Sequence, residues 1–149
     1  MTTAKDALQK IRLRAKNAAF FPPATDSKID FANAMLKNEG AAPMPYDYAA
    51  FLKTTNGLAA PGIELYGTDG IDRHGRTYRF PNLAEANREL LADGNPLIKG
   101  CLLVGDAFLD SIIFDPAEGS YRVVSRLSFA TLRRFANIGE VLEHLLGLL

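Results

Sequence analysis

Acidic side chains are the residues of this sequence whose distribution most suggests a binding chemistry. Residues 58–72 and 100–121 both carry acids and no basic residue. If the two stretches adjoin in a sheet, they form a negative surface that would speed association with a basic partner such as a nuclease. Alternatively, these acids only reflect the preference of charged groups for solvated loops and turns. The candidate partner-binding residues are Glu64, Asp69, Asp72, Asp106 and Asp110.

Histidine and cysteine give little basis for a reaction centre. The sequence has one cysteine, Cys101, and two histidines, His74 and His144, which are far apart in the chain. Metal sites use clustered ligands at short spacing, so we predict neither a metal nor a cofactor. Cys101 opens an apolar run, which favours a buried small side chain over a reactive thiol. Both histidines are expected to be solvated.

Two further motifs bear on nucleotide or nucleic-acid binding. The glycine-containing segment 67–70 lacks the lysine and the strand–helix setting of a phosphate loop, so we interpret it as a turn. Arg73, Arg76 and Arg79 alternate with aromatic residues, as in some nucleic-acid-binding surfaces. On a strand Arg73 and Arg79 share a face and Arg76 points away. We therefore predict a solvated hairpin here, no direct nucleic-acid partner and no catalytic residue.

Composition indicates one ordinary globular domain. The chain has 149 residues, 48% hydrophobic and 23% charged, with 17 basic and 17 acidic side chains. A neutral chain has no general attraction for nucleic acid or anionic lipid. Its apolar runs are too short to span a bilayer, and no apolar run follows the first charged residues, so neither a membrane span nor a secretory signal is expected. One cysteine fits a reducing compartment, and we predict a cytoplasmic protein.

Apolar periodicity and capping residues predict five helices. We expect them over residues 4–20, over residues 28–38 with Ser27 as the cap, from Pro45 to the Asn56-Gly57 stop, from Asn82 towards Gly94, and from Asn137 onward. Strands are expected over residues 63–66, 76–80, 101–104, 111–114 and 121–125, with a tight turn at 115–119. Because helices precede a largely antiparallel group of strands, the pattern favours an α+β fold over a doubly wound one.

A family resemblance adds to this interpretation. In Met44–Leu58 a proline opens a helix with a Tyr and a Phe-Leu pair, and Asn-Gly closes it before the strand of Gly62–Gly67. This combination resembles the SUKH superfamily, which includes many bacterial immunity proteins and fungal cell-wall regulatory proteins. The strand pair of Leu103–Asp106 and Asp110–Asp115, the strand at Tyr121–Val123 and the closing helix are similar too. We expect one domain, with residues 28–149 as its core and residues 1–22 as a helical addition.

The resemblance implies one twisted, mostly antiparallel sheet packed with helices, and a protein without catalytic residues. It implies an immunity protein that neutralises a cognate bacterial toxin by occlusion, with the five acids named above as candidate contacts. Glu64 lies between Ile63 and Leu65, so on a strand it points away from both. Two alternatives remain: a regulatory scaffold or small-ligand-binding module with no toxin partner, and an enzyme whose titratable groups converge in a pocket.

Overall fold

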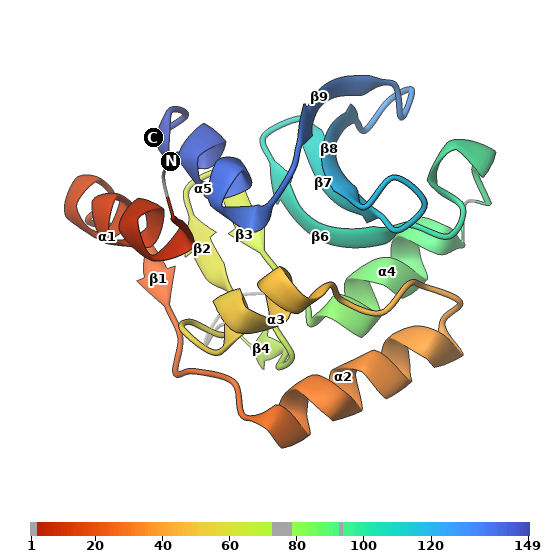
Figure 1. The fold of residues 1–149 in the computed structure, drawn as a ribbon, viewed down its shortest axis with the longest axis horizontal. Coiled ribbons are helices and arrows are strands. Elements are labelled where there is room, and N and C mark those ends of the chain that lie inside the picture. Colours follow the sequence, from red (N-terminus) through yellow and green to blue (C-terminus); the bar gives the residue numbers. More distant parts are fainter. Residues whose placement is uncertain (1–2, 73–78, 93) are drawn as a thin grey trace.

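The computed structural model describes residues 3–72, 79–92 and 94–149, and it confirms the α+β fold class (Figure 1). Within these residues the helices are α1 (Ala4–Arg14), α2 (Asp26–Asn38), α3 (Tyr46–Leu52), α4 (Leu83–Leu91) and α5 (Ile138–Leu146), with a 3-10 turn η1 (Pro96–Ile98). The strands are β1 (Ala19–Phe20), β2 (Leu58–Ala60), β3 (Ile63–Leu65), β4 (Ile71–Asp72), β5 (Arg79–Phe80), β6 (Leu102–Ala107), β7 (Asp110–Asp115), β8 (Ser120–Ser125) and β9 (Thr131–Phe135).

Side chains at their first positions fix where several helices begin. Asn82 accepts a hydrogen bond from the Glu85 amide at 2.8 Å, and the Glu85 side chain accepts one from the Asn82 amide, so the predicted start of α4 at Asn82 is confirmed by a complete capping box. Asn137 caps α5 as predicted. The cap predicted for α2 is wrong: Thr25, not Ser27, accepts from the Lys28 amide, and the helix begins two residues earlier than expected.

The first helix is shorter than its sequence pattern predicts. α1 ends at Arg14, and Ala19 and Phe20 instead pair with Ala59 and Leu58 of β2. The extended chain is held there because the Phe21 amide donates to the buried hydroxyl of Thr55 at 2.9 Å. Beyond residue 14 only alanines continued the helical period, and the pairing with β2 outweighs the helix preference of alanine there.

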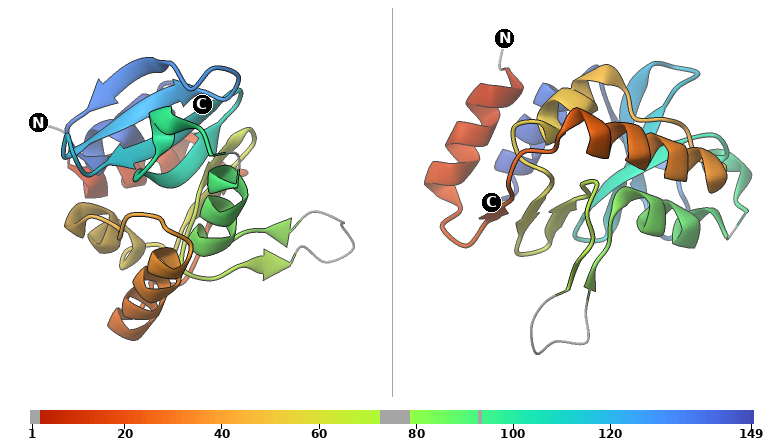
Figure 2. Two further views of the ribbon diagram at one scale, coloured as in Figure 1. Left: turned by 90° about the vertical axis from the view of Figure 1, so that its right-hand side faces the viewer. Right: turned by 90° about the horizontal axis from the view of Figure 1, so that it is seen from below.

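Seven strands form one antiparallel sheet in the order β1-β2-β3-β6-β7-β8-β9. β2 and β9 lie outside the predicted strands, whereas the β7–β8 hairpin across residues 116–119 is confirmed. Register shifts in the β6–β7 and β8–β9 pairings accompany a strong curvature of β6 to β9 (Figure 1). β4 and β5 pair separately and project from the body of the molecule (Figure 2). The predicted strand 76–80 and turn 72–75 lie mostly outside the described residues.

Helices cover both faces of the sheet. On one face, the Asp47 carboxylate of α3 accepts from the Tyr121 hydroxyl at 2.9 Å and from the Ile138 amide at 2.7 Å, which ties α3 to β8 and to the start of α5. α1 lies beside α5 (Figure 1), and its buried residues Leu8 and Ile11 enter the same hydrophobic core. Within the described residues, no helix has the length and apolar character needed to cross a bilayer.

On the other face, a buried amide docks α4 onto β6. Asn87 is fully buried and donates to the Leu103 carbonyl at 2.9 Å, while its side-chain oxygen accepts from the Leu103 amide at 2.8 Å. It also donates to Leu83 within its own helix. The side chain therefore pairs with Leu103 as a neighbouring strand would, at the point where β6 is irregular.

We expect Asn87→Ala to lower the free energy of unfolding by about 3 kcal/mol, because it leaves both backbone groups of Leu103 buried without a partner. Urea denaturation followed by circular dichroism measures the change. The matched control is Arg88→Ala, the next residue on the exposed side of α4, which should change stability little. Equal losses in the two variants would contradict the role given to Asn87.

Candidate binding cleft

A cleft of about 660 Å³ opens between α4, the sheet and the β8–β9 turn. Leu103, Asp106 and Ser111 contribute from β6 and β7. Arg126 and Phe129, both from the β8–β9 turn (residues 126–130), also line the cleft. The remaining lining residues lie just after β3, just before α4 and in α4 itself: Tyr66, Pro81, Glu85, Ala86, Arg88, Glu89 and Leu90. Acidic, basic, hydroxyl and apolar groups thus meet in one hollow, within the volume range of small-molecule sites.

Asp106 is the most constrained polar group of this cleft. It lies opposite Glu64 on β3 and opposite Ser111 on β7, so the three side chains share a face. Its carboxylate accepts a hydrogen bond from the Ser111 hydroxyl at 2.8 Å and another, on the second oxygen, from the Tyr66 hydroxyl. The Tyr66 hydroxyl lies 3.5 Å from the Glu64 carboxylate as well. Two neutral donors therefore hold Asp106 in one orientation.

Arg126 forms only a loose ion pair with the Asp106 carboxylate. Its Nε is 3.5 Å from Asp106, and its Nη2 donates to the carbonyl of Phe108. The Arg126 side chain remains 47% exposed, so solvent screens the ion pair and its contribution to stability is small. The Arg126 backbone amide also donates to the Leu109 carbonyl at 3.3 Å, which joins the β8–β9 turn to the β6–β7 turn.

Three exposed apolar side chains lie on these two joined turns. Phe108, Leu109 and Leu127 are 52%, 79% and 95% exposed, and we call them the apolar rim. Phe108 has φ of 54°, in the left-handed region that favours glycine, and its ring packs against Gly62 of the β2–β3 turn. Phe129, with φ of 59°, is left-handed as well. The backbone conformation of both phenylalanines is therefore costly, by about 1–2 kcal/mol each.

The structure brings together only some of the predicted acidic residues. The two acidic stretches do adjoin, through the pairing of β3 with β6, and Glu64 lies beside Asp106. Asp110 is next to Ser111 in β7 and so points to the opposite face. Asp69 forms an ion pair with Lys28 of α2, away from the cleft. Asp72 lies in β4, and its side chain is outside the described part. Of the described carboxylates, Asp69 and Asp110 therefore do not share the face of Glu64 and Asp106, and the partner-binding role of the five acids stays a prediction.

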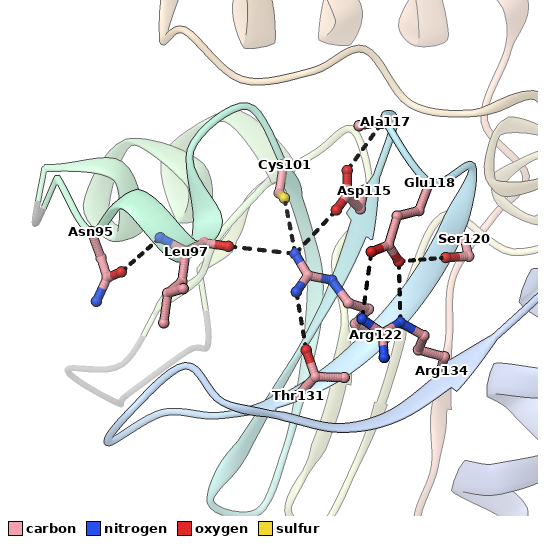
Figure 3. Close-up of polar contacts among 10 residues, drawn as sticks. All are labelled: Asn95, Leu97, Cys101, Asp115, Ala117, Glu118, Ser120, Arg122, Thr131 and Arg134. Atoms are coloured by element: carbon pink, nitrogen blue, oxygen red, sulfur yellow. Dashed lines mark hydrogen bonds and ion pairs between the residues drawn. The ribbon is translucent and has the colours of Figure 1, made fainter.

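A second polar cluster centres on Arg122 of β8 (Figure 3). Arg122 donates to Thr131 at 3.0 Å, to the Leu97 carbonyl at 3.4 Å and to the Cys101 sulfur at 3.6 Å. It also forms an ion pair with Asp115 at 3.2 Å, and both side chains are largely buried. One guanidinium thus joins β7, β8, β9 and the chain around η1, which is the pattern of a structural cross-link.

The chemistry of this second cluster does not favour a nucleophile. Burial raises the pKa of the Cys101 thiol, and nearby Asp115 raises it further, against the opposing effect of Arg122. The thiol is therefore kept protonated, the reverse of an activated cysteine. The prediction that Cys101 is buried is confirmed. Among the described residues, no group of three or more histidine, cysteine, aspartate or glutamate side chains is placed to hold a metal ion.

Sequence reasoning missed most of the groups that line the cleft, above all Tyr66, Ser111, Arg126 and Phe129. One signal was available: Phe108 and Leu109 form a two-residue connection, so Asp106 must pair with Ser111 once the hairpin is recognised. None of the family models, curated proteins or solved structures compared with this chain matches it.

We expect Arg122→Met to lower the free energy of unfolding by about 2–4 kcal/mol, because it leaves the largely buried Asp115 carboxylate unpaired. The double variant Arg122→Met, Asp115→Leu should recover part of that loss, since it removes both charges. A double-mutant cycle by chemical denaturation measures the coupling. Arg134→Met, which breaks the exposed pair with Glu118, is the control. Strict additivity of the two substitutions would show that the pair is not coupled.

His144 on α5 gives a pH-dependent prediction. Burial lowers its pKa below the ordinary value of 6.5, Arg133 lowers it further, and Asp110 opposes them. The unfolded chain therefore binds this proton more tightly, so its contribution to stability is present above pH 6.5 and is lost as the pH falls below it. His144→Gln should lose less stability than the wild type between pH 7.5 and 5.5 in urea denaturation. Parallel losses would contradict the assignment.

Proposed function

We propose that this chain is a non-enzymatic protein-binding domain, an immunity-type protein that neutralises a cognate bacterial toxin in the cytoplasm by occlusion. The SUKH resemblance of residues 28–149 suggests this class of function. The observation that carries the proposal is the apolar rim beside the cleft. Surfaces that bind proteins place apolar and aromatic side chains at the centre of a contact and polar groups around it.

The rim suits such a contact because it is both apolar and fixed. Leu109 and Leu127 are highly exposed, and Arg126 joins their turns through its backbone and its side chain. A surface whose shape is already set loses little conformational entropy when a partner binds. Asp106 lies on the adjoining sheet face and lines the cleft, so the partner surface that fits here combines apolar groups with positive charge.

The test begins with the protein encoded beside this gene. We expect it to be toxic when expressed alone, to be tolerated when this chain is co-expressed, and to form a purified complex with it. Leu127→Asp should weaken that complex at least about 10-fold in calorimetry, because it places a charge in the centre of the contact. Leu13→Asp, at another highly exposed leucine, on α1, is the control and should bind as the wild type does.

Two outcomes would contradict the proposal. In the first, no neighbouring product is toxic or forms a complex. In the second, Leu127→Asp and Leu13→Asp bind equally, which would remove the rim from the interface while leaving a protein partner.

The cleft itself favours the second candidate, a small-ligand-binding module with no toxin partner. Its 660 Å³ and its mixture of hydroxyl, charged and apolar groups resemble ligand sites in general. Thermal unfolding in the presence of a panel of small metabolites separates the two functions. A compound that raises the midpoint for the wild type and not for Ser111→Leu would favour the module. For a toxin-binding domain we expect no such compound.

A further inference from the structure

The carboxylate of Asp106 is prepared to receive a cation. An ionised carboxylate has about four acceptor positions. Two of them are filled by the hydroxyls of Tyr66 and Ser111, both neutral donors that orient the group without cancelling its charge. The ion-pair partner that the described residues supply is Arg126, at 3.5 Å and half exposed. The charge is thus fixed in place and only loosely compensated.

A second carboxylate lines the cleft with Asp106. It belongs to Glu89, and the basic groups among the described lining residues are Arg88 and Arg126. Arg88 is bonded to Glu39 on α2, at 2.8 Å and 2.9 Å, so its charge is compensated from outside the cleft. Among the described lining residues, the carboxylates of Asp106 and Glu89 therefore outnumber the one guanidinium, that of Arg126, whose charge is not compensated from outside the cleft, and the complementary ligand group is positive.

The shape of the site distinguishes arginine from lysine. Phe129 lines the cleft together with Asp106. A planar guanidinium can pair with a carboxylate through two parallel hydrogen bonds and at the same time stack on an aromatic ring, whereas an ammonium presents a compact charge that holds its water more strongly. The apolar rim lies on the two turns that Arg126 joins, and Arg126 itself lines the cleft, so a partner that covers the rim would exclude water from the pair.

We propose that the Asp106 end of the cleft is a receptor for an arginine side chain of the partner protein, and that Arg126 occupies this position in the unbound chain. The inference rests on the proposed function, since it names the group of the partner that the surface recognises. On binding, the partner's guanidinium pairs with Asp106 over Phe129. Arg126 keeps its hydrogen bond to the Phe108 carbonyl and gives up only its weak contact with the carboxylate.

Short peptides test the receptor without the partner. The probes are acetyl-Leu-Arg-Leu-amide and the same peptide with lysine or citrulline in place of arginine, titrated into the full chain labelled with ¹⁵N. We expect the arginine peptide to shift the amide resonances of Ser111, Arg126 and Phe129 in a saturable way. The lysine peptide should bind several-fold more weakly, and the citrulline peptide, which is neutral, should cause no saturable shift.

Three variants complete the experiment. Asp106→Asn should abolish the shifts, whereas Asp110→Asn, on the opposite face, should retain them. Arg126→Gln should tighten the arginine peptide by about 3-fold, because it removes the internal competitor. If Asp106→Asn perturbs the fold, the tighter binding of the arginine peptide by Arg126→Gln still tests the receptor. Equal binding of the citrulline peptide, or weaker arginine binding by Arg126→Gln, would overturn the receptor.

The outcome separates the receptor from the proposed function. If the arginine peptide fails to bind while Leu127→Asp still disrupts a toxin complex, the receptor is wrong and the binding domain stands. If the peptide binds at the cleft and no neighbouring toxin exists, the receptor stands and the toxin partner is wrong.

Discussion

One extra residue in β6 decides which side chains face the cleft. Leu103 pairs with Ile113 and Gly105 pairs with the next residue, Ile112, so Val104 between them has no partner on β7. In a regular strand the alternation would continue from Leu103, and Asp106 would point towards α5 and the core. The bulge reverses the alternation, which brings Asp106 opposite Glu64 and Ser111 on the α4 face. The cleft and its carboxylate therefore depend on this irregularity.

Backbone and side-chain groups from distant segments satisfy the backbone groups at the bulge. The Val104 carbonyl accepts from the Tyr66 amide at 2.8 Å and from the Tyr48 hydroxyl at 3.2 Å. Complete burial raises the pKa of Tyr48 well above its ordinary value, so this hydroxyl remains a donor at physiological pH. Gly105 permits the close approach of β3, because a Cβ there would lie 2.2 Å from the Glu64 carbonyl oxygen. The bulge is thus held from α3, α4 and β3 together, and each of these elements is positioned by it.

Local signals explain which parts of the fold could be predicted. The Asn82 cap and the hairpin turn at 115–119 depend on a few adjacent residues, and both are confirmed. β9 could not be found in this way, because Thr131–Phe135 lies at the edge of the sheet and its exposed arginines hide the apolar alternation. The cleft was invisible for a different reason. Its residues come from several separate segments, and their convergence depends on the Val104 bulge, which no sequence pattern predicted.

Backbone strain at the end of the sheet strengthens the connection between the rim and the cleft. Glycine adopts the left-handed conformation freely, yet residues 108 and 129 are both phenylalanine. Each ring has a place that glycine could not fill: Phe108 packs on Gly62, and Phe129 lines the same cleft as Asp106. Arg126 joins the two turns and donates to the Phe108 carbonyl, so it stabilises the strained conformation of Phe108 and also pairs with the Asp106 carboxylate. Strain, exposed apolar surface and an oriented charge are therefore concentrated in one connected structure, and the proposed binding function rests on this concentration.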